Sequence, residues 1–217
     1  MKHYPINLNI NGRKCVVIGG GDTAYKKVIS LLNAGANVKV VAPRAAAKIH
    51  RLDKKGMIRL INRSYRKEDL KGSDIVYAAT SNPGTNKQIF HDTRGKHIIM
   101  NAADTAVYCD FIVPAVFRKG NIVISVSTDG NAPYVAKFLK KKIARIFTPE
   151  YTKLLNTMIR MRRELLTMKK EGIRIDIEKA LDKLSIKKLN CYIKNDDKQN
   201  MNKYLYNYIH TIRAKVK

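Results

Sequence analysis

A glycine-rich turn joins an apolar run to a helix-like run near the start of the chain, in the stretch CVVIGGGDTAYKK. Gly19, Gly21 and Ala24 follow the spacing G-x-G-x-x-A. In a strand–turn–helix unit the first glycine allows a tight turn, the second lets the backbone approach a pyrophosphate, and the third small residue allows close packing of helix on strand. Free N–H groups and the helix dipole attract phosphate to that helix end. The spacing and its context therefore predict a dinucleotide-binding turn.

The acidic residue that commonly binds the adenosine ribose is missing. It is expected about 20 residues beyond the turn, but no Asp or Glu stands between Asp22 and Asp53. Arg44 follows the second apolar run, where it could bind a 2′-phosphate, which favours NADP. Backbone N–H groups near Pro43 and Arg44 could instead hold the ribose without a carboxylate. The residues alone leave the choice between NAD and NADP open.

The first half of the chain alternates strand-like and helix-like runs, which predicts βαβ units and a parallel sheet. The expected strands lie at 14–19, 37–43, 57–65, 73–80 and 97–103, and the expected helices at 23–35, 45–56 and 86–96.

The pattern changes after Val113. Two strand-like runs, 111–119 and 121–128, are joined by the turn KGN, which indicates a hairpin. An amphipathic helix follows at 132–147, with Val135, Leu139, Ile143 and Ile146 near one face. Basic helices continue from Thr148, with a polar loop at 194–200 and a last helix from Met201. We expect an α/β chain in three parts: a Rossmann-like parallel-sheet domain at 1–113, a small α+β region at 114–147 and a helical domain at 148–217.

The charge of the chain is strongly positive, with 43 Lys and Arg against 17 Asp and Glu, a formal net charge of +26. The excess is +11 up to Val113 and +15 beyond it, so it is not confined to a tail. Such a field attracts anionic partners, such as nucleic acid, acidic lipid or a polycarboxylate small molecule. A general lysine bias of the source organism explains it equally well.

The cysteines and histidines show no metal-ligand spacing, so no permanent metal site is expected. Scattered cysteines fit a reducing compartment. The first residues lack the apolar run of a secretory signal, and the longest apolar runs are only strand-sized. We therefore expect a cytoplasmic protein without a membrane segment.

Four ordered stretches resemble the siroheme synthase family, which comprises precorrin-2 dehydrogenases and sirohydrochlorin ferrochelatases. They are YPINLNINGRKCVVIGGGDTAYKKVISLLNAGANVKVVAP, VYAATSNPGTN, NAADTAVYCDFIVPAVFRKGNIVISVST and GNAPYVAKFLKKKI, and they run from Tyr4 to about Ile146. The resemblance implies a stand-alone enzyme, without a methyltransferase domain, that oxidises precorrin-2 to sirohydrochlorin with NAD rather than NADP. In some members of the family the same site then inserts Fe²⁺ to give siroheme.

The resemblance implies that Asp104, in the stretch NAAD, is the catalytic residue. It follows the fifth expected strand, at the carboxyl edge of the sheet, where open α/β folds bind ligands. A carboxylate there can take a proton as hydride leaves, or take pyrrole protons and contact Fe²⁺ transiently during metal insertion. The alternative is that Asp104 only caps the following turn. The family usually has paired acids here, so the single Asp104 weakens the chelatase expectation more than the dehydrogenase expectation.

The resemblance also assigns residues that contact the cofactor and the substrate. Asn101 either orients the nicotinamide amide or caps its strand. In the loop STDGNAP, Thr128 stands where the family often has Ser, and Asp129 stands where Gly is usual. The expected cofactor contacts are Gly19, Gly21, Asp22 and Thr23 near the pyrophosphate, Pro43 and Arg44 at the adenosine, and Thr80, Asn82 and Asn101 nearer the nicotinamide. The expected substrate contacts are Thr128 and Asn131.

The expected partners follow from the same reading. Precorrin-2 and sirohydrochlorin are the small-molecule partners, with Fe²⁺ where chelation occurs. The region 114–147 is expected to form a homodimer, because short apolar strands need further partners. The alternative hypothesis is a basic Rossmann-type module that senses redox state and binds nucleic acid. The chain shows no helix-turn-helix and no aromatic stacking platform, so we expect no nucleic acid partner.

Overall fold

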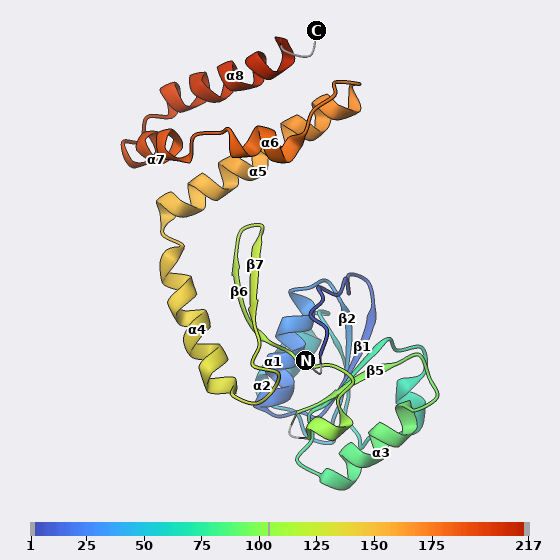
Figure 1. The fold of residues 1–217 in the computed structure, drawn as a ribbon. Coiled ribbons are helices and arrows are strands. Elements are labelled where there is room, and N and C mark those ends of the chain that lie inside the picture. The colour runs from blue at the N-terminus through green and yellow to red at the C-terminus, as the bar shows by residue number, and fades with distance from the viewer. Residues whose placement is uncertain (1–2, 104, 215–217) are drawn as a thin grey trace. The chain divides into compact units, whose positions relative to one another are not determined.

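Five short, largely apolar runs form one parallel sheet with the strand order β3-β2-β1-β4-β5 (Figure 1). The computed structural model describes residues 3–103 and 105–214. From β1 the chain builds β2 and β3 on one side of the sheet, and it then crosses over to build β4 and β5 on the other side. Open α/β sheets bind ligands at such a switch point, between β1 and β4. The strands are β1 Lys14–Ile18, β2 Asn37–Val41, β3 Arg59–Ile61, β4 Ile75–Ala78 and β5 Ile99–Ala102.

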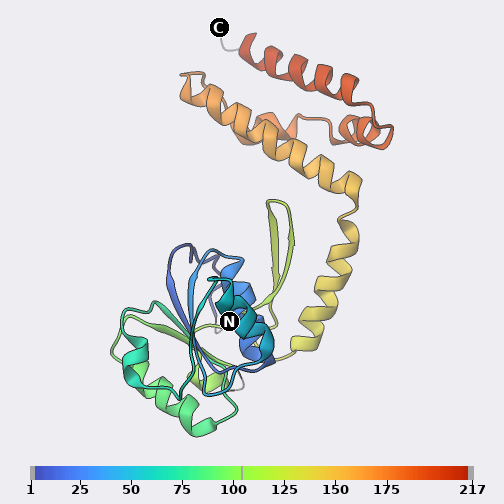
Figure 2. The same ribbon diagram turned by 180° about the vertical axis from the view of Figure 1, so that it is seen from behind.

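Helices cover both faces of this sheet (Figures 1 and 2). Alternate residues of β1 point to opposite faces, as a strand requires: Cys15 and Val17 pack against α1 and α2, whereas Val16 and Ile18 pack on the side of α3. The core residues of both apolar clusters are almost completely buried. Such close packing makes the sheet rigid, and the loops at the carboxyl ends of its strands are therefore held at fixed positions. The flanking elements are α1 Asp22–Leu32, α2 Ala47–Lys54 and α3 Pro83–Thr93, with short 3-10 turns η1 Lys67–Leu70 and η2 Ala106–Tyr108.

A buried carboxylate fastens η1 to the end of β3. Asp69 has only 3% of its side chain exposed and accepts hydrogen bonds of 2.7 and 2.8 Å from the Arg63 guanidinium. It also accepts the backbone N–H of Arg66 at 2.9 Å. Burial alone raises the pKa of Asp69, but these hydrogen bonds outweigh burial and lower it below the ordinary value.

The contacts within the chain divide it into two units. The first contains residues up to Val113 together with 129–131, and the second contains 114–128 and everything from Ala132 onward. The expected three-part division stays a prediction.

The second unit begins with an antiparallel hairpin and continues as helices. The first strand begins at Ala115 and not at Phe111, where the sequence predicted it. Pro114 stands just before it and has no backbone N–H to donate to a neighbouring strand. The sequence also missed α7 and placed the start of the last helix at Met201 rather than Lys198. The elements are β6 Ala115–Lys119, β7 Ile122–Val126, α4 Pro133–Ile146, α5 Pro149–Lys170, α6 Ile177–Asp182, α7 Ile186–Lys194 and α8 Lys198–Ala214.

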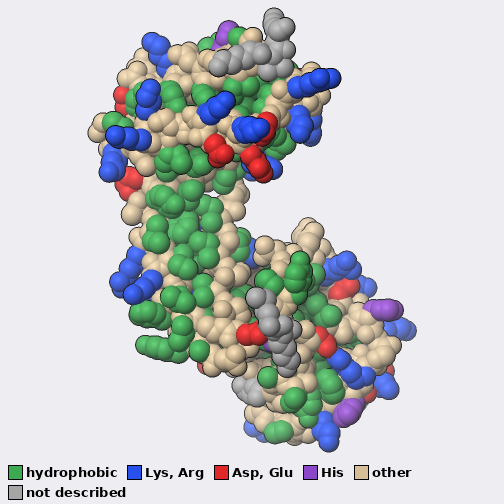
Figure 3. Space-filling model, in the orientation of Figure 1, with side chains coloured by type: hydrophobic (Ala, Val, Ile, Leu, Met, Phe, Trp, Pro, Cys, Tyr) green, Lys and Arg blue, Asp and Glu red, His purple; other side chains and the backbone are tan. Residues whose placement is uncertain are grey.

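Helix α4 differs from the other long helices because its apolar side chains are exposed. Figure 3 shows hydrophobic side chains gathered over this helix, whereas α5 buries Leu154, Met161 and Leu165 against the helices that follow it. The exposed apolar residues of α4 are Tyr134, Val135, Phe138, Leu139 and Ile146.

Candidate functional site at the carboxyl edge of the sheet

The glycine turn between β1 and α1 is wedged between two neighbouring backbone segments. Gly19 has a φ of +129°, and a Cβ atom on it would lie 2.2 Å from the carbonyl oxygen of Ala79. A Cβ atom on Gly20 would lie 2.1 Å from the carbonyl oxygen of Arg44. Both positions therefore need glycine for packing. The sequence predicted a glycine at position 19 for the tight turn, not for this packing, and it made no prediction for Gly20, whose only signal is the uninterrupted run of three glycines.

Gly21 has a different environment, because nothing in the protein lies within 4 Å of the position a Cβ atom would take. It is the N-cap of α1, with extended backbone and no side-chain cap. The N–H groups of a first helical turn have no partner within the helix. Ala24, three residues on, is completely buried and lets the helix lie close to the sheet. The open approach and the uncapped helix end suit a pyrophosphate.

Charged groups around this turn partly offset one another. Asp22 lies in the first turn of α1 and forms an ion pair of 2.8 Å with Lys48 of α2. The hydrogen bond and positive charge of Lys48 lower the pKa of the Asp22 carboxyl. An anion near the predicted phosphate site is unfavourable by itself, and the neighbouring ammonium reduces that repulsion. Thr23, Pro43 and Arg44 are exposed at the same edge.

The polar side chains of the loop after β4, which were predicted to lie near the nicotinamide, form hydrogen bonds within the loop and with α3. Thr80 Oγ1 donates a hydrogen bond of 2.8 Å to Asn86 Oδ1. Asn86 Nδ2 donates to the Thr80 carbonyl at 3.2 Å, which closes the loop onto α3. Asn82 is the N-cap of α3 and accepts the N–H of Thr85 at 3.1 Å. These side chains fix the loop shape, and their contact with a cofactor stays a prediction.

Position 104, predicted to be catalytic, lies outside the described residues, but both flanks of its loop are described. Ala103 N–H donates to the Ala78 carbonyl at 2.9 Å, so the pairing of β5 with β4 continues to the residue before it. On the return, Asp110 N–H donates to the Met100 carbonyl at 2.8 Å. The Cys109 thiol lies 3.2 Å from the backbone nitrogen of Ala102. The loop is therefore closed at its base against β5.

An ion pair strengthens the base of this loop. The guanidinium of Arg94, at the end of α3, donates two hydrogen bonds of 3.0 and 2.8 Å to the Asp110 carboxylate. The same carboxylate accepts the Met100 N–H at 2.8 Å. Arg94 is the main cause of the lowered pKa of Asp110. The sequence does not predict this pair, because only the fold brings residues 94 and 110 together.

Asn101 is buried next to the loop, with 6% of its surface exposed. Its Nδ2 donates to the Phe111 carbonyl at 2.9 Å, whereas its Oδ1 has no hydrogen-bond partner among the described residues. Buried polar atoms are nearly always hydrogen-bonded, so this oxygen is a candidate acceptor for a ligand N–H group.

The two predicted substrate contacts belong to the segment between β7 and α4. The Thr128 hydroxyl accepts the N–H of Ala132 at 3.1 Å, and Asn131 is exposed. Asp129 has a φ of +57°, a left-handed conformation that favours glycine. Its carboxylate is paired with His3 Nδ1.

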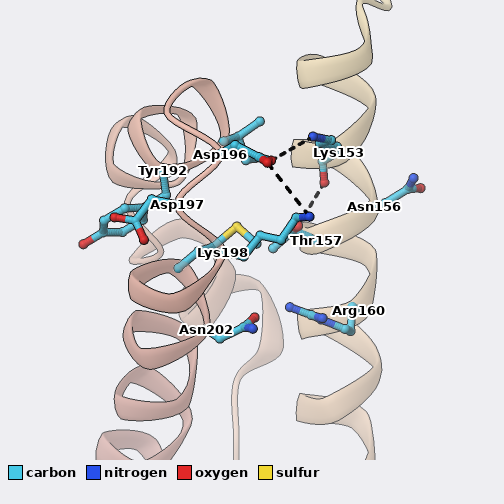
Figure 4. Close-up of a pocket in the computed structure, with 11 residues that line it drawn as sticks. Lys153, Asn156, Thr157, Arg160, Tyr192, Asp196, Asp197, Lys198 and Asn202 are labelled. Atoms are coloured by element: carbon cyan, nitrogen blue, oxygen red, sulfur yellow. Dashed lines mark hydrogen bonds and ion pairs between the residues drawn. The ribbon is translucent and has the colours of Figure 1, made fainter.

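The second unit has a hollow of about 380 Å³ that is lined by residues of its helices (Figure 4). It lies beside α5, α7 and the start of α8. Charged groups on its wall pair with each other: Lys153 Nζ lies 3.3 Å from Asp196 Oδ1. Asp197 accepts the N–H of Asn200 and so caps the start of α8. None of the predicted site residues is among the described residues that line it.

Within 3–103 and 105–214, no three His, Cys, Asp or Glu side chains group in a way that could hold a metal ion. Over the same ranges, no helix has both the length and the apolar character needed to cross a bilayer.

A parallel sheet with a switch point, a glycine turn and an uncapped helix end define a Rossmann-type dinucleotide-binding protein. Residues 6–115 match the family model described as "Putative NAD(P)-binding", and the chain belongs to this family.

Comparison with individual proteins confirms the resemblance to siroheme synthases. The chain is 34% identical to the siroheme synthase of Nitrosococcus oceani over 154 residues, which are 71% of this chain and 33% of that protein. It is 32% identical to the siroheme synthase of Pseudoalteromonas atlantica over 155 residues, again 71% of this chain and 33% of that protein. The chain thus spans about a third of the length of the curated relatives it matches.

Among solved structures, "SirC, precorrin-2 dehydrogenase" is similar over 98% of this chain and 100% of that chain, with a TM-score of 0.74 and 22% identity. This similarity confirms the expected fold class: a parallel sheet domain, a small antiparallel sheet and C-terminal helices.

Proposed function

We propose that this protein is an NAD-dependent precorrin-2 dehydrogenase that forms sirohydrochlorin in siroheme biosynthesis. The observation that carries the proposal is the open, uncapped N-terminus of α1 at Gly21, on the sheet edge where the loop containing position 104 begins. The names of the relatives and of the similar structure support the substrate. The reaction transfers one hydride from precorrin-2 to NAD⁺ and releases one proton.

The residues divide the work between binding and proton transfer. When bound, NAD⁺ accepts the hydride. The first-turn N–H groups of α1 bind its pyrophosphate, and Gly21 leaves room for close approach. Asn101 Oδ1 accepts an N–H group of the ligand. Asp104 holds the proton that leaves the substrate, because a carboxylate can act as a general base there.

We assign NAD rather than NADP on the resemblance to the siroheme synthase family. Arg44 contributes its backbone carbonyl to the packing of Gly20, which is a contact that any residue could supply. Titration calorimetry with both cofactors tests the assignment: NAD⁺ should bind more tightly. Tighter binding of NADP⁺, lost in Arg44→Ala, would contradict it.

The test of the activity is incubation of the purified protein with precorrin-2 and NAD⁺, followed by sirohydrochlorin and NADH absorbance. Asp104→Asn should greatly reduce turnover while NAD⁺ binding stays unchanged. A folded wild-type protein that oxidises precorrin-2 with neither NAD⁺ nor NADP⁺ rules out the proposal. Unchanged turnover in Asp104→Asn and Asp104→Ala rules out the role of that residue alone.

Insertion of Fe²⁺ into sirohydrochlorin is a separate proposal, with Fe²⁺ as a substrate and Asp104 as the group that receives pyrrole protons. Sirohydrochlorin plus Fe²⁺, without NAD⁺, tests it directly. Formation of siroheme faster than in a protein-free control supports the chelatase activity, and an unchanged rate limits the enzyme to oxidation.

We further propose that the protein is a homodimer. The apolar side chains of α4 are exposed, with Phe138 at 46% and Ile146 at 58%. The hairpin β6–β7 is a separate two-stranded sheet, and such hairpins have little stability alone. Both features are explained if a second copy covers them.

A further inference from the structure

Lys27 lies on α1, one turn beyond the predicted pyrophosphate site, and its side chain extends toward β4. Its Nζ lies 5.1 Å from the centre of the Tyr77 ring. Tyr77 is the register partner of Asn101 across the β4–β5 pairing. The ammonium of Lys27 is thus on the side of α1 that faces the strand carrying Asn101.

The surroundings of Lys27 provide little compensation for its charge. It is half-buried, and this burial lowers the pKa of its ammonium, whereas the nearby Cys109 side chain raises it. Among the ion pairs of the described residues, none includes Lys27. By contrast, Lys48 also lies over a ring, that of Tyr25 at 4.8 Å, but it has Asp22 as an ionic partner. A half-buried ammonium without a carboxylate is an unfavourable arrangement that an anionic ligand would relieve.

Asn101, the register partner of Tyr77 on the neighbouring strand, also has a polar atom without a hydrogen-bond partner in the part of the chain that the structure describes. Asn101 Nδ2 lies 3.6 Å from the Cys109 sulfur, the same side chain that interacts electrostatically with Lys27. Asn101 Oδ1 is buried without a partner among the described residues. One face of the sheet therefore presents a cation and a hydrogen-bond acceptor together, next to the loop of position 104. These groups suit a ligand that carries both carboxylates and N–H groups.

We propose that Lys27 binds a carboxylate of the tetrapyrrole substrate and so increases the affinity of the protein for it. This inference rests on the proposed function for the identity of the substrate. Acetate and propionate groups surround such a ring, and pyrrole N–H groups lie within it. Lys27 is a substrate-binding residue, and it takes no part in hydride or proton transfer.

The test compares Lys27→Met with Lys26→Met. Lys26 is the preceding, exposed residue of the same helix, so it is a matched control for loss of one charge. The probe is uroporphyrin III, a stable tetrapyrrole with carboxylates around its ring, and its fluorescence change reports the dissociation constant. NAD⁺ affinity is measured by calorimetry, and KM and kcat for precorrin-2 are measured separately.

Lys27→Met should weaken uroporphyrin binding and raise the KM for precorrin-2 by about ten-fold or more, because it removes a charge-assisted interaction. Changes in kcat and in NAD⁺ affinity should stay within about two-fold, since uniform binding affects mainly KM. Lys26→Met should resemble the wild type. Unchanged uroporphyrin affinity in Lys27→Met overturns the proposal, and so does weakening confined to NAD⁺.

Two further results separate this inference from the proposed function and from misfolding. If the wild type does not oxidise precorrin-2 but Lys27→Met still loses uroporphyrin affinity, the carboxylate site stands and the dehydrogenase proposal falls. If Lys27→Met loses affinity for both uroporphyrin and NAD⁺, the variant Lys27→Arg distinguishes loss of the charge from misfolding. Tetrapyrrole binding should return with the positive charge, and a folded Lys27→Arg without it contradicts the role of Lys27.

Discussion

Gly19 lies so close to Ala79 that a methyl group on the glycine would be 2.2 Å from the Ala79 carbonyl oxygen. Its φ of +129° adds strain for any other residue. We therefore predict that Gly19→Ala lowers the free energy of unfolding by about 2–4 kcal/mol. Urea denaturation followed by circular dichroism measures this change. A stability equal to that of the wild type would show that the turn can relax around a side chain.

Gly21→Ala, in the same turn, should weaken cofactor binding without lowering the stability of the fold. No protein atom lies near the added methyl group, and the backbone there is extended with negative φ. The free energy of unfolding should stay the same or rise by about 0.5 kcal/mol. NAD⁺ should bind about ten-fold more weakly, because the methyl group occupies the approach of the pyrophosphate. Calorimetry checks this, and unchanged affinity would mean that Gly21 does not face the cofactor.

The parallel sheet could be predicted from the sequence because each strand carries its own local signal. The apolar run before Gly19 predicts β1, and the glycines that follow it predict the turn, from residues that are adjacent in the sequence. Helix α7 was missed, although Ser185 caps it and Ile186, Leu189 and Ile193 follow with helical spacing. This helix has only nine residues, so the apolar spacing repeats over little more than two turns and gives a short signal.

The candidate site could be predicted only in part, for a physical reason. The glycine turn is local, but the need for Gly20 comes from the distant carbonyl of Arg44. The placement of Tyr77, over which Lys27 lies, beside Asn101 on the neighbouring strand depends on the register of β4 with β5. No short-range pattern in the sequence records such a pairing.

The Arg94–Asp110 pair should matter for activity, because it closes the loop that contains position 104. Asp110→Asn removes the charge that holds both the guanidinium and the Met100 N–H. We expect a loss of stability of about 1–2 kcal/mol and a fall in kcat for precorrin-2 larger than the change in NAD⁺ affinity. Arg94→Lys should give part of the same loss, since lysine cannot donate the paired hydrogen bonds. Steady-state kinetics with normal kcat in both variants would contradict the role of the clamp.

Asp69 should make the fold sensitive to acid. Its pKa is lower in the folded protein than in the unfolded chain, so the unfolded state takes up the proton first as pH falls. Its contribution is complete above the ordinary carboxyl pKa of about 3.9 and is lost as pH drops through the folded value. Asp69→Asn should cost about 3 kcal/mol at neutral pH and flatten this part of the acid-stability curve. Asp182→Asn, at an exposed position, is the control, and equal curves for the two variants would contradict the assignment.

The exposed face of α4 should determine the oligomeric state. Phe138→Asp places a charge in the middle of the apolar residues, and burying an unpaired charge in a dimer interface is strongly unfavourable. We expect the wild type to have the mass of a dimer by light scattering and Phe138→Asp that of a monomer with an unchanged sheet domain. Lys140→Asp, on the basic part of the same helix, introduces the same side chain outside the apolar face and should remain dimeric. A monomeric wild type, or a dimeric Phe138→Asp, would show that α4 is not covered by a second copy.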